Sequence, residues 1–138
     1  MVETAFVLPV FLLFVLAIFE FGHAFMVVQV LKAAARQGAR LGVADNVTTA
    51  DVQQEARNVM AGAIDPNQVT VMVKDAGAFD SATPPTDVTT LPNAEVSDLE
   101  DGDLFVVRVE TNYSNVRVLR LRFLDGVVLS GQTVMRHE

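Results

Sequence analysis

Apolar residues are concentrated in one stretch near the start of the chain, and this pattern predicts the first element. No polar side chain occurs from Ala5 to Phe19, and only His23 and Gln29 interrupt the apolar run from Phe21 to Leu31. At about 1.5 Å of rise per residue, a helix over this stretch is roughly 40 Å long, enough to cross the hydrocarbon core of a bilayer. We therefore expect one long helix over residues 4–44 that begins as a membrane-spanning segment.

Two residues inside this predicted helix are poor helix formers. Pro9 lies beyond the first turn, where it removes a backbone hydrogen bond, so a bend is expected there. Gly22 costs about 1 kcal/mol relative to alanine. We assign both positions to the assembly surface of the helix.

After residue 31 the helix keeps its period but changes character. A basic stripe at four-residue spacing is formed by Lys32, Arg36 and Arg40. A stripe of small residues on the opposite face is formed by Ala34, Gly38 and Gly42. Small side chains let another backbone approach closely, so this stripe predicts helix–helix packing and an assembly contact. The alternative is an ordinary surface helix that uses alanine for its helix propensity.

The rest of the chain shows shorter patterns. Residues 115–123 alternate as a strand would but also suit a helical turn, so their type stays open. The other predicted elements are a helix over residues 48–63 with Thr48 or Thr49 as its cap, a strand over 68–75, a long loop over 76–103, and strands over 104–114 and 126–138.

This order of elements predicts an α+β fold. A long N-terminal hydrophobic helix is followed by a small globular domain, in which one short helix packs on a three- or four-stranded antiparallel sheet. We divide the chain into residues 1–44, the hydrophobic assembly helix, and residues 45–138, the globular domain.

Composition and charge exclude several classes of function. Cysteine is absent from the 138 residues, so no disulfide framework, cysteine-based zinc site or thiol nucleophile is available. The net charge is −7, and residues 45–104 hold twelve acidic residues against two basic ones. We therefore expect a solvated acidic exterior and no nucleic-acid partner.

No arrangement of residues suggests catalysis. The segment from Leu129 to Gln132 lacks the glycines and the histidine partner of a hydrolase nucleophile elbow. We therefore expect no enzyme activity, no catalytic residue, no metal and no cofactor. Asn46 and Asn112 begin glycosylation sequons, a pattern that also arises by chance.

Glu20 is the unusual residue of the apolar helix. A carboxylate inside a bilayer costs several kcal/mol, so it normally marks a partner, a pore or a site. On one helix Glu20 can reach His23, three residues on, or it can meet a polar group of a neighbouring subunit; local exposure to solvent is a third explanation. A metal site is a fourth, because Glu-x-x-His is half of a di-iron motif, but the chain supplies no second copy.

The first 45 residues resemble the TadE-like family of pilins and pseudopilins from tight-adherence systems. The resemblance is carried by Val2–Glu3, by Val7–Pro9 in the apolar run, by Glu20–Gly22 and by Ala34–Arg40. The end of the chain, "SGQTVMRHE", is also similar to the ends of many members. The middle of the chain carries no motif of the family.

The resemblance implies a route of assembly and a set of partners. Such proteins are cut by a prepilin peptidase and moved by pilus assembly machinery from the inner membrane into a helical filament of identical subunits. By the same resemblance, Glu3 would pair with the N-terminal ammonium of an adjacent subunit. Glu3 is two residues after Met1 instead of the usual four after the processed terminus, a departure that puts the mature start in doubt.

Three functions agree with these observations. The first is a structural subunit of a type IV-like extracellular pilus for surface attachment, which polymerises through its N-terminal helix. The second is a minor pseudopilin that primes or tips such a filament. The third is a membrane-anchored envelope domain.

Overall fold

The computed structural model describes the backbone of residues 2–118 and 124–138, and the side chains of the first helix from Thr4 onward. Its main elements are α1 (Val2–Leu41), α2 (Thr49–Met60), β1 (Thr70–Asp75), β2 (Leu104–Asn112), α3 (Tyr113–Val116) and β3 (Val128–Arg136). This confirms the predicted α+β fold. The sequence left open whether residues 115–123 form a strand or a helical turn. The structure shows a short helix up to Val116, the end of α3, and residues 119–123 lie outside the described residues.

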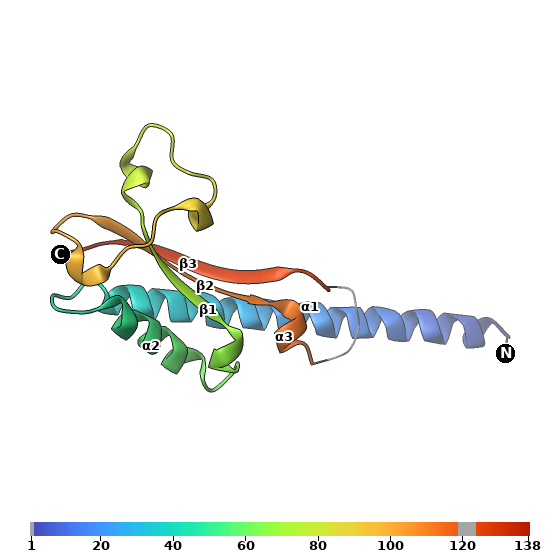
Figure 1. Ribbon diagram of the computed structural model, residues 1–138. Helices are drawn as coiled ribbons and strands as arrows, with labels where there is room; N and C mark the ends of the chain where they lie inside the picture. Colours follow the sequence, from blue (N-terminus) through green and yellow to red (C-terminus); the bar gives the residue numbers. More distant parts are fainter. Residues whose placement is uncertain (1, 119–123) are drawn as a thin grey trace.

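The three strands form one antiparallel sheet in the order β1–β2–β3. Val73 is opposite Val107 in the first pair of strands, and Val107 is opposite Thr133 in the second. Figure 1 shows the sheet lying along the second half of α1, with α2 beside it, while the first half of α1 extends beyond the rest of the chain.

Both faces of β2 are covered, because its alternating side chains enter two different clusters. Phe105, Val107 and Val109 join the main core against α1 and α2. Val106 points to the other face, where it packs with Val88 from the segment between β1 and β2. That segment was predicted as a loop. It contains three short 3-10 helices, η2 (Gly77–Asp80), η3 (Val88–Thr90) and η4 (Val96–Asp98).

The helix α2 begins where its sequence provides a cap. The backbone N–H of Asp51 donates to the Thr48 hydroxyl (3.3 Å), and the Thr48 N–H donates to the Asp51 carboxylate (3.0 Å). This reciprocal pair satisfies two donors that the first turn of a helix leaves free. Of the two caps that the sequence offered, Thr48 and Thr49, the structure uses Thr48.

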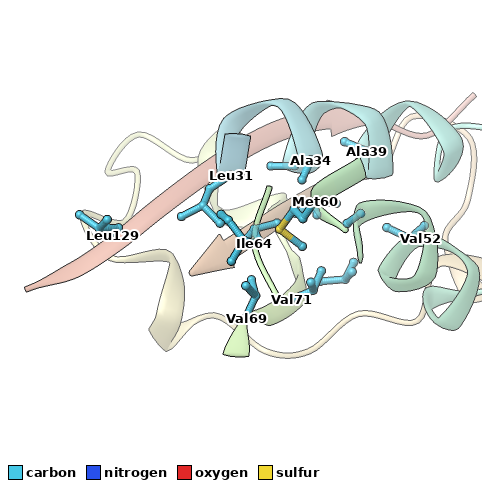
Figure 2. Packing of buried hydrophobic residues seen from close by; sticks show 14 of the residues in the cluster. Leu31, Ala34, Ala39, Val52, Met60, Ile64, Val69, Val71 and Leu129 are labelled. Atoms are coloured by element: carbon cyan, nitrogen blue, oxygen red, sulfur yellow. The ribbon is translucent and has the colours of Figure 1, made fainter. Parts of the chain in front are cut away.

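The main core joins the second half of α1 to the globular part. Figure 2 shows Ala34 and Ala39 of α1 above Met60 of α2, with Leu31 of α1 near Ile64 and with Val71 of β1 in the same cluster. Leu31, Ala34 and Ala39 are completely buried. One face of residues 20–41 therefore packs in the same core as the globular part, because the apolar face of a small sheet needs a helix to cover it. The division of the chain at residue 44 stays a prediction.

Candidate functional site

The first half of α1 is almost uncovered. From Thr4 to Phe19 every large side chain of the helix is exposed or half-buried, and Phe6, Phe14 and Phe19 are 80%, 66% and 71% exposed. Soluble monomers rarely expose a continuous apolar surface of this kind, so it marks contact with a membrane or another protein.

Burial begins abruptly at Glu20. From this residue on, one face of α1 is covered at alternating spacings of four and three residues, which is the repeat of a single helix face. Glu20, Ala24 and Val27 are 2%, 7% and 1% exposed. The other face stays open, since Phe25 is 68% exposed and the basic stripe of Lys32, Arg36 and Arg40 is also exposed.

The Glu20 carboxylate lies in this buried face without a hydrogen-bond partner among the described residues. Both of its oxygens are buried, and neither accepts a hydrogen bond from any described residue. The nearby Tyr113 hydroxyl donates instead to the main-chain carbonyl oxygen of Glu20 (3.4 Å). Burial raises the pKa of Tyr113, and the nearby Glu20 side chain raises it further.

His23 is not the partner of Glu20, which removes one of the explanations left open for this residue, and the burial of Glu20 removes local exposure to solvent. Its Nε2–H donates to the main-chain carbonyl oxygen of Val116 in α3 (2.8 Å). Its ring also meets the ring of Tyr113 edge to face, with 6.4 Å between the centroids. His23 therefore fastens α3 to α1. In the described part of the chain no third histidine, cysteine or acidic residue joins Glu20 and His23 in a group that could hold a metal ion.

A cavity of about 530 Å³ opens beside Glu20. Its walls are mostly apolar and come from Ile18, Phe19 and Met26 of α1 and from Val118 after α3. Three polar side chains, those of Glu20, His23 and Tyr113, line it as well.

Gly22 contributes to this cavity by having no side chain. It lies on the cavity wall, and a Cβ built at this position would meet no atom within 4 Å. The residue predicted as a weak point of the helix therefore opens space beside Glu20.

The stripe of small residues packs within the chain. A Cβ on Gly38 would lie 3.1 Å from the main-chain oxygen of Val52, and one on Gly42 would lie 3.1 Å from the Phe105 ring. The close helix–helix approach is present, with α2 as the second helix. The expected contact of Ala34, Gly38 and Gly42 with a neighbouring subunit is corrected, because α2 and β2 already cover this face.

Two predicted assembly residues belong to the first half of α1. Pro9 is inside the helix, which continues through it, and the expected bend stays a prediction. Glu3 belongs to the helical backbone, but its side chain lies outside the described side chains, so its pairing also stays a prediction.

Both glycosylation sequons begin at exposed residues. Asn46 follows α1 in a turn with φ of 62°, a left-handed conformation that asparagine tolerates better than most residues. Asn112 ends β2. Glycosylation at either position stays a prediction.

Sequence reasoning missed Tyr113, Val116 and Gly131. The first two approach α1 across 93 positions of sequence, a separation that no local pattern reveals. Gly131 lies on β3 against the α1 backbone at Leu31 and Lys32, where a Cβ would be 2.5 Å from the Leu31 carbonyl carbon. A lone glycine within a strand was the available signal, because it often marks close approach of another backbone.

Comparison with known proteins bears on the helix. Residues 1–40 match the family model described as TadE-like protein, which confirms the resemblance drawn from the sequence. No curated protein and no solved structure matches the chain. By length and composition, α1 can cross a membrane. A stretch of 18 residues within it has a mean hydropathy of 2.5, and 6% of that stretch is buried in the structure. Together, the helix and the match fit a membrane-anchored, pilus-associated protein.

Proposed function

We propose that this chain is a structural subunit of a type IV-like, tight-adherence extracellular pilus that serves surface attachment. Before assembly, the first half of α1 would anchor it in the inner membrane. It would then polymerise with identical subunits through that same half. A prepilin peptidase and pilus assembly machinery would process and move it.

The observation that carries this proposal is the uncovered half of α1 in a chain whose first 40 residues match the TadE-like model. The globular part packs a core of its own, and among the described residues nothing covers the apolar helix from Thr4 to Phe19. Such a surface needs lipid before assembly and protein afterwards, since a long apolar helix is not stable in water.

The arrangement also supports repetition. The uncovered helix extends from one end of the globular part (Figure 1), so copies can align their helices while their globular parts remain outside. Contacts between unlike surfaces of identical subunits produce open helical assemblies when the rotation does not close into a ring.

The test is the copy number of the chain in surface fibres. Fibres sheared from cells that make the native pilus are purified, and each subunit is quantified by mass spectrometry. We expect this chain to be the most abundant component and to form filaments by negative-stain microscopy after detergent is removed. A few copies per fibre would instead identify a minor pseudopilin, and absence from fibres would identify an envelope domain.

A further inference from the structure

The end of the globular part from which the uncovered helix extends carries exposed apolar side chains. We call this end the base, and it consists of residues 113–118 and 124–128. Figure 1 shows α3 and the start of β3 at this end of the globular part. In the base, Val118, Val127 and Val128 are 72%, 39% and 52% exposed. Exposed apolar side chains that continue an uncovered apolar helix indicate a contact with a partner.

Hydrogen bonds fix the level of the base along α1. The His23 Nε2–H donates to the carbonyl oxygen of Val116 (2.8 Å), and the Tyr113 hydroxyl donates to the carbonyl oxygen of Glu20 (3.4 Å). The Tyr113 N–H in turn donates to the carbonyl oxygen of Val127 (2.9 Å). The base therefore lies beside the first buried turn of the helix.

The start of β3 lies at nearly the same level. Gly131 packs against the α1 backbone at Leu31, and Leu129 lines a recess with Phe25, so β3 ascends in the same direction as α1. A strand rises about 3.3 Å per residue and a helix about 1.5 Å. Val128, three residues before Gly131, is therefore roughly 10 Å back along the helix, close to the level of Phe25.

This level coincides with the boundary of a bilayer that α1 spans. The hydrocarbon core is about 30 Å thick, or roughly 20 residues of helix. Measured from Thr4, the residue after the charged Glu3, the core ends near Ala24. On the open face of α1, the exposed side chains change from apolar at Phe25 to basic at Lys32, as a boundary in this region requires.

Two apolar recesses flank α1 at the base. The cavity of about 530 Å³ is bounded by Ile18 and Met26 of the helix and by Val118. The second recess, of about 170 Å³, lies between Phe25 and Leu124. At about 100° per residue, the helix residues of the two recesses are centred about 140° apart. A neighbouring helix would cover one side of α1, whereas lipid surrounds every open side, so acyl chains fit this arrangement better than a second copy does.

We propose that the base docks into the surface of the bilayer while α1 anchors the chain there. The side chains of Val118, Val127 and Val128 enter the edge of the hydrocarbon core, and acyl chains fill the two recesses. The base also carries the ion pair of Arg117 and Asp125 (3.3 Å), whose side chains are about one-third exposed, so it stops at headgroup level. This inference rests on the anchoring proposed above and adds a second contact, which holds the globular part against the membrane.

Single-cysteine labelling measures this depth, because the chain has no cysteine of its own. A small fluorophore is attached to each of four full-length variants: Val118→Cys and Val128→Cys in the base, Val134→Cys higher on β3, and Phe14→Cys in the uncovered helix. Each is placed, one chain per disc, in phosphatidylcholine nanodiscs, whose two faces are both open to water. Emission is recorded with nitroxide quenchers at a shallow or a deep position of the lipid, and with iodide in water.

The labels at Val118 and Val128 should lose most of their emission to the shallow lipid quencher and be protected from iodide. Val134 is the matched control, since it is an exposed valine (40%) on the same strand and roughly 20 Å farther from the membrane than Val128. Its label should respond to iodide and to neither lipid quencher. Phe14 is roughly 15 Å beyond Thr4, near the bilayer centre, so its label should respond to the deep quencher.

A charge in the base provides a second test. Val128→Asp places a carboxylate at the edge of the hydrocarbon core, where its burial is costly. The base should then move away from the bilayer, and the label at Val118 should become accessible to iodide. Val134→Asp, the same substitution higher on the same strand, should leave that label unchanged. Thermal unfolding of each variant checks that the globular part remains folded.

Three results would overturn the proposal. The first is base labels that iodide reaches as readily as the Val134 label while the Phe14 label is quenched from the lipid, because α1 would then be anchored with the base clear of the bilayer. The second is an equal effect of Val128→Asp and Val134→Asp on the Val118 label. The third is protection from iodide only in discs that hold two chains, which would assign the base to a second copy.

Failure of the anchoring itself gives a different result. A Phe14 label that neither lipid quencher reaches would show that α1 does not span the bilayer, and both the anchoring and the docking of the base would be wrong. Whether the chain forms pili is answered separately, in sheared fibres.

Discussion

The two halves of α1 form one continuous helix, yet they differ in composition and have opposite surroundings. Residues 4–19 expose large apolar side chains around the helix, whereas residues 20–41 bury one face against α2, β2 and β3. The first half has large residues on every side. The second has small residues where the backbone of α2 approaches and charged residues on the outside. One helix therefore serves as a core element of the chain and as a surface for partners outside it.

The strongest test of this comparison is truncation at two points. Removing residues 1–19 should leave a folded, soluble monomer, because the deleted part makes no contribution to the core. Removing residues 1–28 also deletes Glu20, Ala24 and Val27, which are buried, and should lower the free energy of unfolding by several kcal/mol. Urea unfolding followed by circular dichroism measures both.

The outcome that would contradict the comparison is equal stability of the two truncated chains. That result would mean that the globular part does not depend on the turns of α1 between residues 20 and 28. An insoluble chain lacking residues 1–19 would also count against it, because the globular part would then carry an association surface of its own.

The next largest effect is expected at Gly131, where β3 crosses the second half of α1. Gly131→Ala places a Cβ against the backbone of Leu31 and Lys32, which cannot move aside as a side chain would. The loss of stability should reach or exceed the upper end of the usual 1–3 kcal/mol for overpacking. Gly62→Ala is the control, since a Cβ there meets no atom within 4 Å, and it should change stability by less than about 0.5 kcal/mol. Similar melting temperatures for the two variants would refute the close contact.

The sequence predicts most of the elements because their signals are local. The apolar run gives α1, and Thr48 with Asp51 gives the start of α2. The alternation of Val69, Val71 and Val73 gives β1, since all three are buried on one face. Each of these signals lies within a few residues of the structure that it specifies.

The partners of the candidate site could not be predicted in the same way. Glu20 stands out in the sequence, but its surroundings depend on Tyr113, which is brought close only by the fold. The spacing of Gly38 and Gly42 correctly indicates a close backbone approach, but spacing does not say whether that backbone belongs to the same chain. The helix that packs against the small residues is α2, whose apolar face supplies Val52 and Ala56.

A substitution in this stripe distinguishes folding from assembly. Gly38→Leu should destabilise the isolated chain by about 1–3 kcal/mol, because the added side chain meets Val52 and Ala56 of the same molecule. Gly22→Ala, on the same helix but facing open space, should instead stabilise it by up to about 1 kcal/mol through helix propensity. Differential scanning calorimetry of the full chain in detergent measures both. A Gly38→Leu variant that melts like the parent but forms no fibres would instead indicate that this stripe contacts a neighbouring subunit.

A smaller effect is expected from acid at the start of α2, which holds the second half of α1 in place. Hydrogen bonds from Thr48 lower the pKa of Asp51 below 3.8, and the Thr49 N–H lowers the pKa of Glu95 below 4.5. A carboxylate with a depressed pKa stabilises the folded state above its unfolded pKa, and this contribution is lost as the pH falls through the folded pKa. Stability should therefore decline below about pH 4.5.

The double variant Asp51→Asn, Glu95→Gln tests this origin. It should be less stable than the parent at pH 7, and its melting temperature should fall less between pH 5 and pH 3. An unchanged slope against pH would show that other carboxylates cause the acid sensitivity.

The smallest effect on folding is expected in the first half of α1. Phe14 is 66% exposed, so Phe14→Ala should change the free energy of unfolding of the globular part by less than about 0.5 kcal/mol. Leu31→Ala, a truncation of a completely buried residue on the same helix, should cost about 2–5 kcal/mol. If Phe14 packs against other subunits, fibre yield should fall in Phe14→Ala although the monomer is as stable as the parent. Urea unfolding in detergent and the mass of sheared fibres are measured for both variants. A Phe14→Ala chain that loses monomer stability as Leu31→Ala does would mean that the first half of α1 also folds against its own chain, and the contrast between the two halves would be wrong.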